Sequence, residues 1–155
     1  MQIFFLRHAA AEGHAASDFH RRLTPDGTEQ AAKAGKFFVR HGLHPDAILS
    51  SPVVRARQTA EIVAKALGMD FIEVPWLACG MEPEECLHQL SVRSGSVLFV
   101  GHEPDFSHAI AHLIGLPDPS ALNIRKASLT CVEMADIHPA CGQLQFFVPV
   151  RLMSR

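Results

Sequence analysis

The sequence lacks the features of a membrane-spanning, secreted or disulfide-bonded protein. No apolar run reaches the roughly 18 residues that a membrane span needs. The apolar start, 1–6, has no basic leader and no small-residue cleavage site after it, so we expect a buried strand there rather than a signal peptide. None of the four cysteines belongs to a C-x-x-C pair. We therefore expect reduced thiols and a cytoplasmic protein.

An excess of positive charge is also missing. The 14 lysines and arginines are balanced by 16 aspartates and glutamates, which gives a net charge of −2. Proteins that bind nucleic acids through the phosphates usually carry a positive excess, so we expect no nucleic-acid partner. His108 and His112 have the spacing of helical metal ligands, but no H-E-x-x-H motif or carboxylate partner accompanies them. The sequence therefore predicts no metal site.

Internal repeats, charge blocks and Ser/Gly linkers are absent as well. The 155 residues fit one domain, 1–155, which can bury enough surface to fold without a metal or a disulfide. Strand-like and helix-like segments alternate, which predicts an α/β fold, a three-layer α/β/α sandwich with a mostly parallel central sheet. The expected strands are 1–6, 46–50, 71–74, 96–100, 127–134 and 143–150, and the main helices begin at Thr24-Pro25, at Ser51-Pro52, before Leu87 and after Pro104.

Three of the predicted strands end in polar residues that suit phosphate chemistry. Arg7-His8 follows the first strand, the segment 50–55 with Arg55 follows the second, and Gly101-His102 follows the fourth. In a parallel sheet the functional crevice lies beyond the carboxyl ends of the strands. Arginine N–H groups match phosphate oxygens, and a neutral imidazole nitrogen can attack phosphorus. The sequence therefore predicts a phosphoryl-binding crevice with a nucleophilic histidine.

These segments resemble the motifs of a known family. Leu6-Arg7-His8-Ala9 resembles the Arg-His-Gly signature of the histidine phosphatase superfamily, also called phosphoglycerate-mutase-like. Ser50-Ser51-Pro52-x-x-Arg55-Ala56-x-Gln58-Thr59-Ala60 resembles its second motif, and Val100-Gly101-His102-Glu103-Pro104 resembles its third. The resemblance implies a phosphoglycerate-mutase-like fold and a metal-independent phosphatase without a cofactor. It also implies His8 as the nucleophile, with Arg7, Arg55 and His102 as the rest of the phosphate pocket.

Within that superfamily the chain is similar to the SixA type of phosphohistidine phosphatase. The length is close, and Arg21-Arg22-Leu23-Thr24-Pro25-Asp26-Gly27 resembles the Arg-Pro-Leu-Thr-x-x-Gly segment of that type. The resemblance implies a substrate-binding role for Arg21. It also implies a phosphorylated partner, either a protein that carries phosphohistidine or a small phosphorylated substrate.

The general acid is not identified by any motif. Among the acids of the segment 79–85, Glu82 is our candidate, and the alternative is that it simply begins a helix. Without an acid the leaving group must be a good one, such as the imidazole of phosphohistidine. A small-molecule phosphomonoesterase or mutase of the same superfamily, which would need the acid, is the second hypothesis. A catalytically silent module that binds a phosphorylated ligand is the third.

Overall fold

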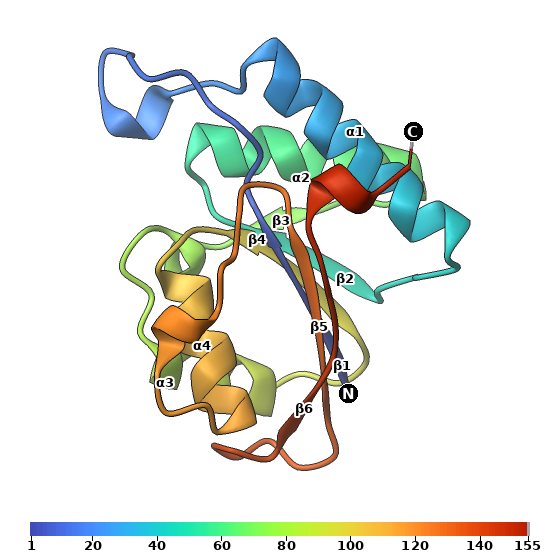
Figure 1. Ribbon diagram of the computed structural model, residues 1–155, viewed down its shortest axis with the longest axis vertical. Coiled ribbons are helices and arrows are strands. Elements are labelled where there is room, and N and C mark those ends of the chain that lie inside the picture. Colours follow the sequence, from blue (N-terminus) through green and yellow to red (C-terminus); the bar gives the residue numbers. More distant parts are fainter. Residues whose placement is uncertain (155) are drawn as a thin grey trace.

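The computed structural model describes residues 1–154 and places a six-stranded sheet between two layers of helices (Figure 1). Helices α1 and α2 cover one face of the sheet, and α3 and α4 cover the other. This arrangement confirms the predicted three-layer α/β/α sandwich. The strands are β1 (Gln2–Arg7), β2 (Ala47–Ser50), β3 (Ile72–Glu73), β4 (Val97–Gly101), β5 (Leu129–Met134) and β6 (Gly142–Val148). The α-helices are α1 (Pro25–Arg40), α2 (Val54–Leu67), α3 (Pro83–Ser91) and α4 (Asp105–Ile114).

The sheet is mostly parallel, as predicted. Its strand order is β3-β2-β4-β1-β5-β6, and the four strands from β3 to β1 run parallel. β5 and β6 are antiparallel additions, so that β6 forms one edge. Arg7 pairs with Gly101 and Ser50 pairs with Val100, so β1, β2 and β4 end in register. This register brings the three polar strand ends of the sequence to one edge of the sheet.

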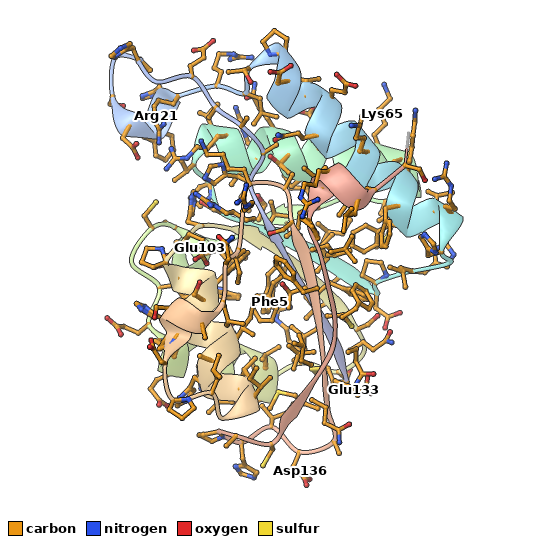
Figure 2. All side chains as sticks on the ribbon, viewed as in Figure 1. Phe5, Arg21, Lys65, Glu103, Glu133 and Asp136 are labelled. Atoms are coloured by element: carbon orange, nitrogen blue, oxygen red, sulfur yellow. The ribbon has the colours of Figure 1, made fainter. Side chains whose placement is uncertain are left out.

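Alternate residues of the central strands build the core on both faces. Phe4 packs edge-on against Phe38 of α1, with ring centroids 5.5 Å apart. Phe5 points to the other face, where its ring centroid lies 5.2 Å from that of Phe106 in α4 (Figure 2). β4 is buried along its whole length, as a central parallel strand should be. The strand end that carries His8 is therefore fixed by packing on both sides of the sheet.

The start of α2 differs from the prediction, whereas the start of α1 agrees with it. Thr24 caps α1 as expected, because its Oγ1 accepts a hydrogen bond of 3.0 Å from the Gly27 N–H. α2 begins at Val54 rather than at Ser51, and no side chain caps it. Ser51 is fully buried and accepts a 3.1 Å hydrogen bond from the Val53 N–H, so it belongs to the turn that leads into the helix. Within residues 1–154 no helix is both long and apolar enough to cross a membrane.

Candidate active site

His8 stands immediately after β1 and is held from both sides. Its backbone N–H donates a 2.9 Å hydrogen bond to Gly101 O, and the next N–H, of Ala9, donates to Thr59 Oγ1 at 3.1 Å. Thr59 in turn donates to Arg55 O at 2.8 Å, which ties the β1 end to α2. The side chain of His8 is only 6% exposed. The position of this imidazole is therefore set by β4 and α2 as well as by its own strand.

The hydrogen bonds of His8 define its tautomer. Nδ1 lies 2.8 Å from the carbonyl oxygen of Ala9, and a carbonyl can only accept, so Nδ1 carries the proton. Nε2 is then unprotonated. It accepts a long hydrogen bond of 3.4 Å from Nε of Arg55. A neutral imidazole with its lone pair beside a guanidinium group is a nucleophile directed toward an anion-binding group.

Arg55 is the second residue of α2, and its side chain is almost completely buried beside His8. It is 4% exposed. Nη1 donates a 2.9 Å hydrogen bond to Asp18 O, and Nη2 lies 3.3 Å from Asp18 Oδ2. These contacts come from the short 3-10 helix η1 (Asp18–His20), which packs on α2. The loop before α1 thus holds the guanidinium group over His8.

His102 enters from the end of β4, and the centroids of its ring and the His8 ring are 5.3 Å apart. Its Nε2 lies 2.8 Å from Ser51 Oγ. That oxygen accepts the Val53 N–H and still has its own proton to donate, so we assign the contact as a hydrogen bond from Ser51 to Nε2, which leaves the ring proton on Nδ1. Nδ1 is buried and has no partner within residues 1–154. It is therefore a donor that a phosphoryl oxygen can accept from.

Arg7 supplies a second guanidinium group from the end of β1. Its Nη1 donates a 2.8 Å hydrogen bond to Ile124 O, whereas its Nε is buried and has no partner in the described part of the chain. Buried donors without a partner are rare in proteins, because they lose the hydrogen bonds they make in water. Arg7 Nε and His102 Nδ1 both need an acceptor, and a bound phosphoryl group would provide one.

Both histidines are strongly biased toward the neutral form. Burial lowers the pKa of His8 to about 3; the hydrogen bond to Ala9 O opposes this shift and the neighbouring positive charges reinforce it. Burial also lowers the pKa of His102 to about 4, with the charge of Arg55 as the next cause. A neutral His8 is the form that can attack phosphorus.

Arg21 and Glu82, the less certain candidates from the sequence, lie in different surroundings. Arg21 forms an ion pair with Asp18, with Nη2 2.9 Å from Oδ1, and so joins the group that holds Arg55 (Figure 2). Glu82 is exposed and stands just before α3, where its side chain does not cap the helix. It lines an open cavity of about 460 Å³ together with Cys79. The structure thus links Arg21 to Arg55 only through Asp18, and it leaves Glu82 exposed beside Cys79.

Two further residues bear on the site but carry no motif in the sequence. Asp105 is buried, and its Oδ2 accepts hydrogen bonds from the N–H groups of Gly80 at 2.9 Å and Met81 at 3.1 Å. This anchors the loop that places Cys79 Sγ 3.8 Å from Nη2 of Arg55. The only sequence signal for Asp105 was an acidic residue in the first turn of a helix, which is common for electrostatic reasons alone.

Metal ligation finds no support in the described part of the chain. No group of three histidine, cysteine, aspartate or glutamate side chains there could hold an ion. His112 does have a carboxylate partner, contrary to the sequence analysis, because the fold brings Glu84 Oε1 to 3.0 Å from its Nε2. Two residues, one on α3 and one on α4, do not make up a metal site.

Comparison with known proteins defines the class. Residues 3–78 match the model of the histidine phosphatase superfamily (branch 1). A phosphohistidine phosphatase SixA homologue of Haemophilus influenzae is 33% identical over 132 residues, which cover 77% of this chain and 80% of that protein. An uncharacterised protein of Picosynechococcus sp. is 31% identical over 140 residues, covering 83% of this chain and 82% of its own length. The chain therefore belongs to the histidine phosphatase superfamily, and its enzyme class is that of a phosphatase, a hydrolase.

A solved structure supports the fold independently. The protein histidine phosphatase SixA complexed with tungstate superimposes with a TM-score of 0.90 at 24% identity, covering 99% of this chain and 100% of that one. At this identity the agreement concerns the backbone arrangement. It confirms the phosphoglycerate-mutase-like architecture that the sequence motifs implied.

Proposed function

We propose that the chain is a single phosphatase domain that hydrolyses phosphohistidine on a protein through a phosphorylated His8. The observation that carries the proposal is the state of His8: its Nδ1 proton is held by Ala9 O, and its unprotonated Nε2 faces Arg55. The SixA homologue of Haemophilus influenzae bears the name of a phosphohistidine phosphatase, which supports this substrate class. The four free cysteines are consistent with a reducing compartment, and we place the protein in the cytoplasm.

The first step is transfer of the phosphoryl group to His8. Arg55 and Arg7 hold the equatorial oxygens, and His102 donates its Nδ1 proton to one of them in a hydrogen bond. Nε2 of His8 attacks phosphorus as the bond from phosphorus to the substrate nitrogen breaks. The substrate ring carries a proton on its other nitrogen before the transfer, so it leaves as a neutral imidazole. No metal or cofactor takes part in this scheme.

The second step is hydrolysis of the phosphoenzyme. Water attacks phosphorus, the bond to Nε2 breaks, and inorganic phosphate departs while His8 returns to its neutral form. The hydrogen bond from Nδ1 to Ala9 O, 2.8 Å long, persists through both steps and stabilises the positive charge that the ring acquires while it is phosphorylated. The two steps use the same arginines and the same histidine pair.

Phosphohistidine suits this site better than an alkyl phosphate does. An alkoxide needs a proton from a general acid as it leaves, whereas imidazole is a good leaving group. Glu82 is exposed and lines a neighbouring cavity with Cys79, and this cavity favours a small-molecule phosphomonoesterase or mutase as the second candidate function. In that case Glu82 would be the acid. The third candidate, a silent binding module, predicts phosphate binding without any covalent phosphoenzyme.

Kinetics with two substrates separate these candidates. We expect rapid hydrolysis of a synthetic peptide that carries phosphohistidine, slow hydrolysis of an alkyl phosphate of similar size, and no effect of EDTA. His8→Ala abolishes both activities, while Glu82→Gln leaves the first unchanged. Equal rates on both substrates, with an acid limb that Glu82→Gln removes, would favour the phosphomonoesterase instead. Unchanged turnover in His8→Ala would contradict the covalent route altogether.

A further inference from the structure

A basic cavity adjoins the active site on the side of Arg7, and the reaction does not use it. It has a volume of about 530 Å³. Arg7 is one of its lining residues, so the cavity adjoins a residue of the candidate phosphate pocket. All the charged residues that line it are cations; the lining residues are Arg7, Gln30, Asn123, Arg125, Lys126, Pro149, Val150 and Arg151.

Three of these cations have no acidic partner. Arg125, Lys126 and Arg151 are exposed, and within residues 1–154 none of them forms an ion pair. They come from two segments far apart in the sequence, which the fold joins beside Arg7. Like charges gathered in one cavity repel each other, and an anion relieves that repulsion. In a protein with a net charge of −2, such a local excess of positive charge marks a place for a negatively charged ligand.

A second cavity of about 390 Å³ continues the first and is apolar. The two share Asn123, Arg125, Pro149 and Arg151, so they form one groove along the end of β6. We call this pair of joined cavities the β6 groove. Beyond the shared residues it is lined mainly by Leu122, Ile124, Leu144 and Phe147. Leu144 is 44% exposed and Phe147 is 38% exposed, which is high for large apolar side chains.

An irregularity in β6 creates the apolar part of the groove. Leu144 pairs with Val132 and Phe147 pairs with Thr130, and a register shift lies between these pairs. Residues three apart in a regular strand face opposite sides of a sheet, but the extra residue of a bulge brings both to the same side. Thr130 lines the groove here; it is 2% exposed, and its buried Oγ1 has no partner in residues 1–154.

We infer that the β6 groove binds the polypeptide that flanks the phosphorylated residue of the substrate. Acidic side chains of that segment lie over Arg125, Lys126 and Arg151, and an apolar side chain packs against Leu144 and Phe147. This inference rests on the proposed function, since it assumes that the phosphoryl group is carried on a protein. A protein that presents its phosphoryl group to His8 must cover the surface next to Arg7. The substrate class is therefore a phosphohistidine protein with an acidic and apolar sequence or surface beside the phosphorylated residue.

Two synthetic peptides of equal length test the inference. Each carries one phosphohistidine, flanked in one peptide by Asp, Glu and Leu and in the other by Ser and Gly. The ratio of their kcat/KM values is the informative quantity, because any effect on the phosphoryl group itself is common to both. We expect wild-type protein to favour the acidic peptide by about tenfold at low salt, and the preference to shrink at high salt.

Charge reversal tests whether the cations of the β6 groove cause the preference for the acidic peptide. The double variant Arg125→Glu/Lys126→Glu should bring the ratio near one, and Phe147→Ala should lower it about threefold. The matched control is Lys36→Glu/Lys65→Glu, which changes the net charge equally at exposed positions outside the groove. Figure 2 shows Lys65 at the end of the α1–α2 layer opposite Arg21. The control should keep the wild-type ratio.

A binding measurement distinguishes failure of the groove from failure of the proposed function. Fluorescence anisotropy with the unphosphorylated acidic peptide should show binding that the control pair retains and the Arg125→Glu/Lys126→Glu pair loses. A ratio near one in wild-type protein, or a preference that survives the double variant, would overturn the inference even when phosphohistidine is hydrolysed. If folded wild-type protein hydrolyses neither peptide, the proposed function fails. The anisotropy measurement then decides on its own whether the β6 groove binds an acidic peptide.

Discussion

Ser51 Oγ lies 2.8 Å from Nε2 of His102, and this contact sets the role of that histidine. The same oxygen accepts the N–H of Val53 and keeps a proton to donate; in the tautomer assigned above, that proton goes to Nε2 and the ring proton is on Nδ1. Nδ1 is then the donor that faces the phosphoryl site. A serine that resembles a helix cap in the sequence therefore acts as a positioning residue for the reaction.

Removing the Ser51 hydroxyl should misplace the His102 proton. We expect Ser51→Ala to lower kcat about tenfold with little change in KM, because the lost hydrogen bond matters most when charge develops on the phosphoryl oxygens. Ser50→Ala is the matched control, since Ser50 is equally buried but donates to the backbone oxygen of Ser51. Steady-state kinetics on both variants test this; equal losses of kcat would show that the effect of Ser51 is merely structural.

The low pKa values of His8 and His102 predict a pH dependence of stability. Their folded-state pKa values, about 3 and about 4, lie below the usual value near 6.5 of an unfolded histidine. As pH falls through 6.5 the unfolded state binds these protons first, so the free energy of unfolding decreases from there toward pH 3. The slope is about 1.4 kcal/mol per pH unit for each histidine.

NMR titration checks these pKa values directly. The ring protons of His8 and His102 should keep the chemical shifts of the neutral form from pH 8 down to about pH 5 in the folded protein, and should titrate near 6.5 in urea. Urea denaturation over the same range should be less pH-dependent in His102→Asn than in wild-type protein. A folded-state midpoint near 6.5 for either ring would contradict the neutral, buried pair.

The carboxylate of Asp105 should be needed for the order of the 79–81 loop. Asp105→Ala leaves the buried N–H groups of Gly80 and Met81 without an acceptor, which costs about 2 kcal/mol of stability. Cys79 should then be alkylated faster, with Cys141, the other exposed cysteine, as the internal reference. Asp105→Asn keeps an acceptor oxygen and should restore most of both properties. If Cys79 is alkylated at the same rate in the two variants, the Asp105 side chain does not anchor the 79–81 loop.

Gly27 lets the first turn of α1 approach the chain after His8. A Cβ atom there would lie 1.9 Å from the backbone oxygen of Ala10, so Gly27→Ala forces the two segments apart. We expect a loss of about 2–3 kcal/mol in the free energy of unfolding and reduced activity, because Ala10 is two residues from His8. Gly13→Ala, where nothing lies within 4 Å of the added atom, is the control and should be nearly neutral.

Much of the site was predictable because the catalytic candidates stand at strand ends. Arg7 and His8 lie at the end of the buried strand β1, and His102 follows the parallel strand β4. The carboxyl ends of parallel strands meet at one edge of the sheet, so these residues were expected to lie together. The order of elements and the parallel sheet follow from apolar patterning and from helix signals such as Thr24-Pro25. A structural feature was predictable from the sequence wherever the residues of a single segment determine it.

The remaining contacts were not predictable because they join distant segments. Asp105 reaches Gly80 across the gap between α4 and the loop before α3, and no spacing in the sequence encodes that distance. The β6 groove depends on a bulge between Leu144 and Phe147, which a pattern of alternating residues does not reveal. Ser51 has the residue type and position of a cap, and only the packing of β4 against β2 turns it toward His102.

Trapping of the phosphoenzyme tests the central claim most directly. Wild-type protein is mixed with the phosphohistidine peptide, quenched in alkali to preserve phosphoramidate bonds, digested and examined by mass spectrometry. The account predicts a phosphoryl group on His8 that is stable in alkali and lost in acid, and none in His8→Ala. Turnover of the peptide with phosphate on another residue, or with His8→Ala as active as wild type, would contradict it.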